Sequence, residues 1–289
     1  LIGLFLMGAI GSLIVSTNPA ILADEMGEHG KVGVSEANTL TSLFSTLAPI
    51  AVGFFGAMAV TWRPAVYLVT SLAFLIGLGI LLSPKFPWKN KQAELQKTNR
   101  QSKLPGRYWL FWVTLVISIS IEFCMIYWGS DYMQAHLAMP KESATQWVSL
   151  FLVGMVVGRY LGSLLLQKYE RFLILIVSVA IGALGFVVFW LGESQFVSLV
   201  GLFLGGLGVA NLYASFVTLS FDAAGAARAA AGSATTLASG VAILLLPFAL
   251  GFLADLLGIR IAMLLVALLY LVLIRLLLSG KKASVRNPV

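Results

Sequence analysis

One carboxylate of the sequence, Glu122, lies deep within a long apolar run. At helical spacing it shares one stripe with Ser118, Met125, Gly129 and Tyr132, and Trp128 lies beside that stripe. An ionisable group in hydrocarbon is costly and is therefore a functional hypothesis by default. Such a carboxyl can take up and release a proton, or it can hydrogen-bond directly to a hydroxylated solute. The alternative is a structural role, with Glu122 paired to a neighbouring helix or permanently protonated.

Further polar side chains in the apolar runs are predicted to bind the same solute. They are Asn211, Asn38, Asn18 and Thr236, and Trp128 adds an aromatic face that can stack on a sugar. Amides both donate and accept hydrogen bonds, which suits hydroxylated solutes. Polar and small residues also hold membrane helices together, and aromatic residues commonly anchor at the interface. A packing role therefore stays open for each of these residues.

Other kinds of chemistry have little support in the sequence. His29 and His136 are far apart and predict no metal site, and the single cysteine, Cys124, has no base beside it. Neither a Gly-x-Ser-x-Gly nucleophile motif nor a phosphate-binding loop is found in these residues. We therefore predict a protein that is not an enzyme, with no catalytic residues, no cofactor and no metal.

The composition indicates the elements that must position these residues. Of 289 residues, 59% are hydrophobic and only 11% are charged, and the mean hydropathy is +0.94. Soluble domains carry roughly a quarter charged residues, so a water-soluble domain is excluded. A membrane-spanning helix needs about 20 mostly apolar residues. Nine such segments predict an all-α membrane protein; they run near 1–23, 36–60, 65–83, 108–134, 146–167, 172–191, 196–220, 228–253 and 259–279.

Charge sets the predicted orientation, because cytoplasmic loops hold an excess of Lys and Arg. If the polar segment 84–107 is cytoplasmic, 16 of the 19 basic residues fall on that side, and so does the C-terminus. This asymmetry accounts for the net charge of +7 without any nucleic-acid partner. We expect a multi-pass monomer of the cell (inner) membrane, whose partners are the lipid bilayer, a small-molecule solute and protons.

An internal repeat appears when the sequence is shifted by 198 residues. Asp24 then falls on Asp222 and Pro49 on Pro247, with several glycines aligned at the same offset. The last three segments match the first three, as in two parallel repeats. The pattern predicts that 1–83 holds the last three helices of a first half, that 84–107 is a basic cytoplasmic linker, and that 108–289 is a complete six-helix second half with a short cytoplasmic tail. We expect an N-terminally truncated form of a twelve-helix protein with two pseudo-symmetric halves.

Two local motifs carry a family resemblance. Gly158-Arg159-Tyr160-Leu161-Gly162, followed by Lys168 and Arg171, resembles the cytoplasmic loop motif of the major facilitator superfamily, although its usual Asp is not evident. The run from Pro247 through Gly251 and Asp255 to Arg260 resembles the end of that family's eleventh helix. The resemblance implies a bundle of helices four to twelve, similar to sugar permeases, and a gating loop that contains Gly158, Arg159, Gly162 and Arg171.

The resemblance implies a secondary active transporter that moves a small polar solute such as a sugar, coupled to protons, by alternating access. Efflux of amphipathic compounds within the same superfamily is the alternative, although Leu47–Gly53 lacks the flanking glycines of drug antiporters. Two alternatives belong to other functional classes: an intramembrane enzyme and a transport-inactive membrane scaffold.

Overall fold

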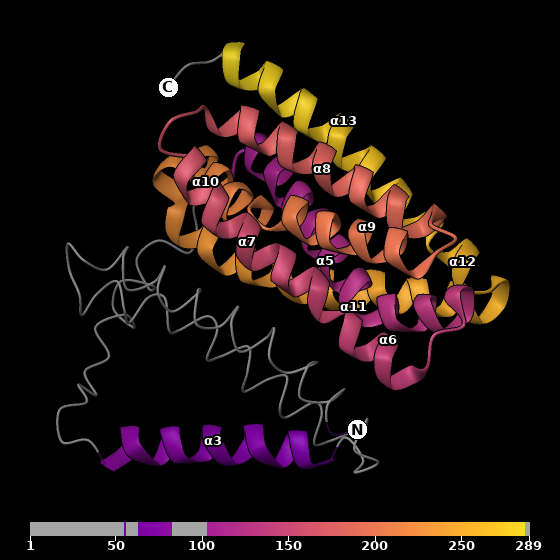
Figure 1. Ribbon diagram of the computed structural model, residues 1–289. Helices are drawn as coiled ribbons and strands as arrows, with labels where there is room; N and C mark the ends of the chain where they lie inside the picture. Colours follow the sequence, from indigo (N-terminus) through magenta and orange to yellow (C-terminus); the bar gives the residue numbers. More distant parts are fainter. Residues whose placement is uncertain (1–54, 56–62, 83–102, 287–289) are drawn as a thin grey trace. The chain divides into compact units, whose positions relative to one another are not determined.

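A computed structural model describes Phe55 and residues 63–82 and 103–286 (Figure 1). Every regular element in these ranges is helical. The elements are α3 (Arg63–Leu82), α5 (Gly106–Leu137), α6 (Lys141–Trp147), α7 (Ser149–Leu165), α8 (Arg171–Leu191), α9 (Gln195–Val209), α10 (Leu212–Ala224), a 3-10 turn (Gly225–Ala227), α11 (Arg228–Leu257), α12 (Ile259–Ala262) and α13 (Leu264–Arg286).

Six stretches of the described residues are long and apolar enough to cross a membrane. They are Gly106–Leu137, Lys141–Leu165, Arg171–Leu191, Gln195–Ala224, Ala230–Leu257 and Ile259–Gly280. Each agrees within a few residues with one of the last six predicted segments, so the all-α membrane bundle is confirmed. The first two predicted segments lie almost wholly outside the described residues, and the third corresponds to α3, whose apolar stretch is Val66–Gly79. The described residues thus contain six candidate spans, and the predicted nine stay a prediction.

Three of the spans are interrupted, which their continuous hydropathy does not reveal. The breaks fall at Val148 between α6 and α7, at Ala210 and Asn211 between α9 and α10, and at Met263 between α12 and α13. The break after α9 follows a cluster of glycines, which are poor helix formers. Apolarity decides where a chain enters the membrane, whereas these breaks depend on local backbone preference and on neighbouring helices.

Glycines draw three helices together on one side of the bundle. A side chain at Gly154 of α7 would collide with the backbone of Phe203 of α9. On the other side of α9, Gly185 of α8 fits against the backbone at Gly205. Small residues allow helix backbones to approach closely in membranes. As a result, α7 and α8 both pack mainly against α9.

Helix α5 runs through the middle of the bundle, in contact with α10, α11 and α13 (Figure 1). Along α11, four side chains of α5 donate hydrogen bonds to main-chain carbonyls, and we call this contact the α5–α11 seam. The bonds are Tyr108 to Ala231 (3.0 Å), Trp112 to Ala234 (2.7 Å), Ser120 to Ala242 (3.2 Å) and Trp128 to Pro247 (2.9 Å). Residue numbers rise together along both helices, so they run parallel. The alanine-rich start of α11 permits this approach.

Candidate functional site

Four polar side chains from four helices lie within electrostatic or hydrogen-bonding range of at least one other member, and we call them the polar cluster: Glu122, Arg159, Tyr213 and Ser239. Glu122 lies near the middle of α5, Arg159 on α7, Tyr213 on α10 and Ser239 on α11. The charge of Arg159 acts on the Glu122 carboxyl. The Tyr213 hydroxyl lies in the electrostatic range of Glu122 and close to the side chain of Ser239. The cluster therefore joins a carboxyl, a guanidinium and two hydroxyls across helices distant in sequence.

The predicted stripe around Glu122 faces the bundle interior. Ser118, Met125, Gly129 and Tyr132 are all buried, whereas Glu122 itself is half-buried. The Ser118 hydroxyl donates to the carbonyl of Leu115 on its own helix, at 2.9 Å. Glu122 is thus the member of the stripe that combines ionisable chemistry with access from outside the core.

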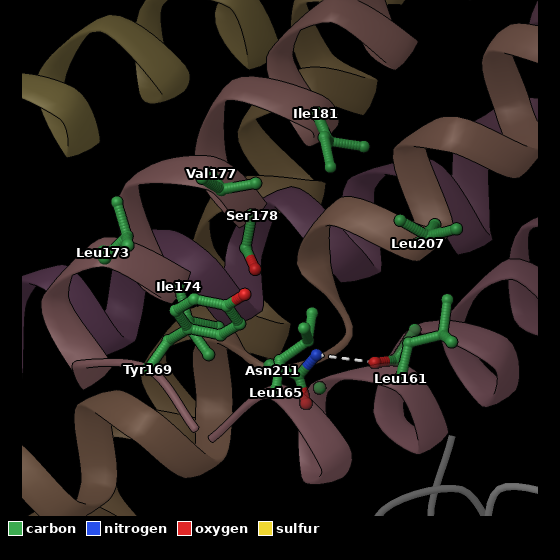
Figure 2. Close-up of a pocket in the computed structure, with 12 residues that line it drawn as sticks. Leu161, Leu165, Tyr169, Leu173, Ile174, Val177, Ser178, Ile181, Leu207 and Asn211 are labelled. Atoms are coloured by element: carbon green, nitrogen blue, oxygen red, sulfur yellow. Dashed lines mark hydrogen bonds between the residues drawn. The ribbon is translucent and has the colours of Figure 1, made fainter. Parts of the chain in front are cut away.

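Arg159 and Asn211 hold α7 against the break between α9 and α10. The Nε of Arg159 donates to the carbonyl of Ala210 at 3.4 Å. The Nδ2 of Asn211 donates to the carbonyl of Gly158 at 2.7 Å, and Figure 2 shows this second bond as a dashed line. The side chain of Asn211 also fills the space above Gly162. Within the structure, Asn211 therefore acts as a helix–helix contact, the packing alternative left open by the sequence.

The residues of the predicted gating loop lie on both sides of the connection between α7 and α8. Gly158, Arg159 and Gly162 lie in the last turns of α7, which continues to Leu165, and Arg171 is the first residue of α8. Gly158 lies against Leu207 and Ala210, and Gly162 lies against Asn211, so both glycines pack at the break between α9 and α10. Both lie inside the predicted span 146–167, the connection to α8 is Leu166–Glu170, and the gating role of these residues stays a prediction.

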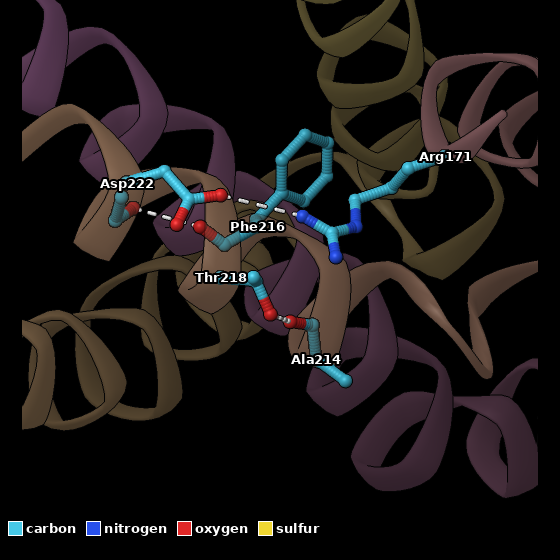
Figure 3. Close-up of polar contacts among 6 residues, drawn as sticks. Arg171, Ala214, Phe216, Thr218 and Asp222 are labelled. Carbon is cyan, nitrogen blue, oxygen red and sulfur yellow. Dashed lines mark hydrogen bonds and ion pairs between the residues drawn. The ribbon is translucent and has the colours of Figure 1, made fainter. Parts of the chain in front are cut away.

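Arg171 has a carboxylate partner that the motif itself does not supply. Its Nη1 lies 3.4 Å from Oδ2 of Asp222, in the last turns of α10, and both side chains are partly exposed (Figure 3). Asp222 lies 51 residues after Arg171 in the sequence, so the motif alone does not indicate this pairing. The available signal was that Asp222 follows the predicted segment 196–220, at the same predicted membrane side as Arg171.

The other predicted residues fall outside the polar cluster or outside the described ranges. The indole N–H of Trp128 is used in the α5–α11 seam. Thr236 is exposed on α11, one turn from Ser239, and its hydroxyl donates to Gly232 of its own helix at 3.2 Å. Asn18 and Asn38 lie outside the described residues. Sequence reasoning missed Ser239, which stands in an alanine-rich stretch with no pattern to distinguish it.

A metal centre has no candidate in the part of the chain that the structure describes. No three His, Cys, Asp or Glu side chains there come together in a group that could hold an ion. The ionisable members of the polar cluster are a single carboxyl, one guanidinium and one phenol. This set can exchange a proton and bind hydroxyl groups.

The family follows from a match over nearly the whole sequence. Residues 1–241 and 110–288 match the family model described as Major Facilitator Superfamily. The chain belongs to the major facilitator superfamily. Members of this superfamily are transporters and not enzymes.

Individual members of this superfamily are similar to the chain in sequence or in fold. It is 27% identical over 172 residues to an uncharacterised MFS-type transporter of Yersinia pestis. The aligned region covers 57% of this chain and 44% of that protein. The fold is similar to that of FucP in an outward conformation, with a TM-score of 0.55, 16% identity, and coverage of 75% of this chain and 54% of that one. The fold is also similar to that of a variant of the Escherichia coli fucose:proton symporter. That comparison gives a TM-score of 0.56 at 17% identity and covers 78% of this chain and 57% of the symporter. The chain spans about half the length of these relatives.

Proposed function

We propose that the protein carrying this sequence is a proton-coupled secondary transporter of a small polar solute, in which Glu122 carries the proton. The observation that supports this role most directly is the polar cluster. Glu122 is the carboxyl of that cluster, half-buried, and it interacts with a cation on α7 and a phenol on α10. Intramembrane ionisable residues that face the bundle or a water-filled cavity mark substrate and proton pathways in transporters.

The arrangement of helices suggests how proton and solute can be coupled. Arg159 compensates the charge of a deprotonated Glu122, and it is attached to the α9–α10 break through Ala210. A shift of α10 relative to α5 and α7 would change the separation of Arg159, Tyr213 and Glu122. The proton affinity of Glu122 would then differ between the two states. Alternating access requires such a difference between its outward and inward forms.

The chemistry of the polar cluster favours a neutral, hydroxylated solute. When Glu122 is deprotonated, its charge and that of Arg159 are opposite, so together they present no net charge to a ligand. The hydroxyls of Tyr213 and Ser239, with Thr236 one turn away, can donate and accept hydrogen bonds. A sugar has this complementary pattern. The likeness in fold to a fucose:proton symporter is consistent with this class of solute.

Solute-dependent proton movement tests this proposal. The full-length protein is reconstituted into liposomes that contain a pH-sensitive dye, and L-fucose and other neutral sugars are added as probes. We expect at least one sugar to acidify the liposome interior, and a charged analogue such as the corresponding sugar phosphate to have no effect. Sugar uptake that moves no protons would contradict the proposed coupling. Movement of only charged or amphipathic compounds would contradict the proposed solute class.

A further inference from the structure

An apolar groove of about 410 Å³ lies between α7 and α8. Leu161 and Leu165 form one wall, Leu173 and Val177 form the other, and Leu207 and Asn211 form the floor (Figure 2). The groove is separate from the polar cluster and includes none of its four residues.

The groove follows from the way the helices pack. Because α7 and α8 both approach α9 through glycines, their larger side chains diverge on the outside of the bundle. Leu165, Leu173 and Val177 are each between 44% and 47% exposed, although all three are apolar. In a membrane-spanning bundle, an outward apolar surface meets lipid chains rather than water.

The depth of the groove matches one leaflet of a bilayer. Its lining on α8 runs from Leu173 to Ile181. These two positions are eight residues apart in the sequence, which corresponds to a rise of about 12 Å at 1.5 Å per residue. The hydrocarbon core of a bilayer is about 30 Å thick, so the groove spans most of one leaflet. One acyl chain of a phospholipid occupies the same depth.

Charged residues of both signs are neighbours in sequence of Tyr169, which lines one end of the groove. They are Lys168, Glu170 and Arg171, and Asp222 forms an ion pair with Arg171. Two cations and two carboxylates complement a headgroup that itself carries a phosphate and an ammonium. A headgroup with only negative charge would be repelled by the two carboxylates.

We infer that this groove binds a zwitterionic phospholipid of the phosphatidylethanolamine type. One acyl chain lies between α7 and α8, the phosphate lies near Lys168 and Arg171, and the ammonium lies near Glu170 and Asp222. The lipid belongs to the leaflet at the Arg171 end of α8. It completes the outer surface where α7 and α8 do not pack against each other.

Lipid retention tests the inference. The full-length protein is purified in detergent from membranes that contain phosphatidylethanolamine and phosphatidylglycerol, washed extensively, and analysed by native mass spectrometry. We expect one retained phosphatidylethanolamine. Val177→Trp fills the groove and should reduce this retention at least fivefold. Leu184→Trp is the matched control, because Leu184 is exposed on α8 and does not line the groove.

The headgroup contact is tested with a second pair of variants. Lys168→Ala should lower retention several-fold, whereas Lys141→Ala, at the start of α6, should not. Thermal unfolding midpoints within about 2 °C of that of the unmodified protein show that each variant is folded. Equal retention in Val177→Trp and Leu184→Trp, or preferential retention of phosphatidylglycerol, would overturn the inference.

Discussion

The indole N–H of Trp128 on α5 donates a hydrogen bond of 2.9 Å to the carbonyl of Pro247 on α11. The ring of the same indole occupies the space where Gly251 would carry a side chain. Pro247 and Gly251, four residues apart on α11, thus form a single contact site for Trp128 of α5. The spacing that resembles a family motif therefore has a packing function here, and Trp128 is an anchor of the α5–α11 seam.

Gly251→Ala should destabilise the protein. The added Cβ would collide with the Trp128 ring, and overpacking of this kind costs about 1–3 kcal/mol. Gly240→Ala on the same helix is the control, because its Cβ would meet no neighbouring atom and alanine is the better helix former. Thermal unfolding in detergent should show a lower midpoint for Gly251→Ala only. Equal midpoints for the two variants would refute the tight contact.

The Arg171–Asp222 ion pair should contribute little to stability, because both partners are partly exposed. Exposed pairs are worth about 0–1 kcal/mol. We expect Asp222→Arg to lower stability slightly through repulsion between like charges. Combining it with Arg171→Asp should restore most of the loss. A double-mutant cycle measured by chemical unfolding gives the coupling directly, and a coupling well above 1 kcal/mol would contradict this estimate.

Asn211→Ala should affect folding more than solute binding. Its Nδ2 bond to Gly158 joins the α9–α10 break to α7, and such interhelical bonds are worth about 0.6 kcal/mol, up to about 1.7. We expect a lower unfolding midpoint together with an unchanged apparent affinity for the transported solute. A tenfold loss of affinity at an unchanged midpoint would instead show that Asn211 is a ligand-binding residue.

The predicted orientation can be tested by labelling in intact cells. Glu142 and Gln167 are exposed near opposite ends of the span Lys141–Leu165. Glu142→Cys should react with a membrane-impermeant maleimide added outside, and Gln167→Cys should react only after the membrane is permeabilised. The native Cys124 is buried and should give little background. The reverse pattern would show that the basic-residue asymmetry predicts the wrong orientation.

Apolar runs alone predicted the six spans from residue 106 onward, because burial in lipid depends mainly on composition. The breaks at Val148 and Asn211 escaped prediction because they depend on backbone propensity and on contacts with other helices. The sequence drew attention to Glu122 because an isolated carboxylate in an apolar run is conspicuous, and its role as a proton carrier stays a prediction. Its relation to Arg159 and Tyr213, and the pairing of Arg171 with Asp222, are contacts between distant segments that no helical periodicity encodes.

The measurement that bears most directly on the proposed function compares uphill accumulation with exchange for Glu122→Gln. Glutamine retains the size and hydrogen bonding of the side chain but cannot release a proton. In proteoliposomes that contain the full-length protein, Glu122→Gln should abolish accumulation of the transported sugar driven by a pH gradient while sparing equilibrium exchange. The control Glu193→Gln changes an exposed carboxylate just beyond the end of α8 and should behave like the unmodified protein. Unchanged accumulation in Glu122→Gln would contradict the account.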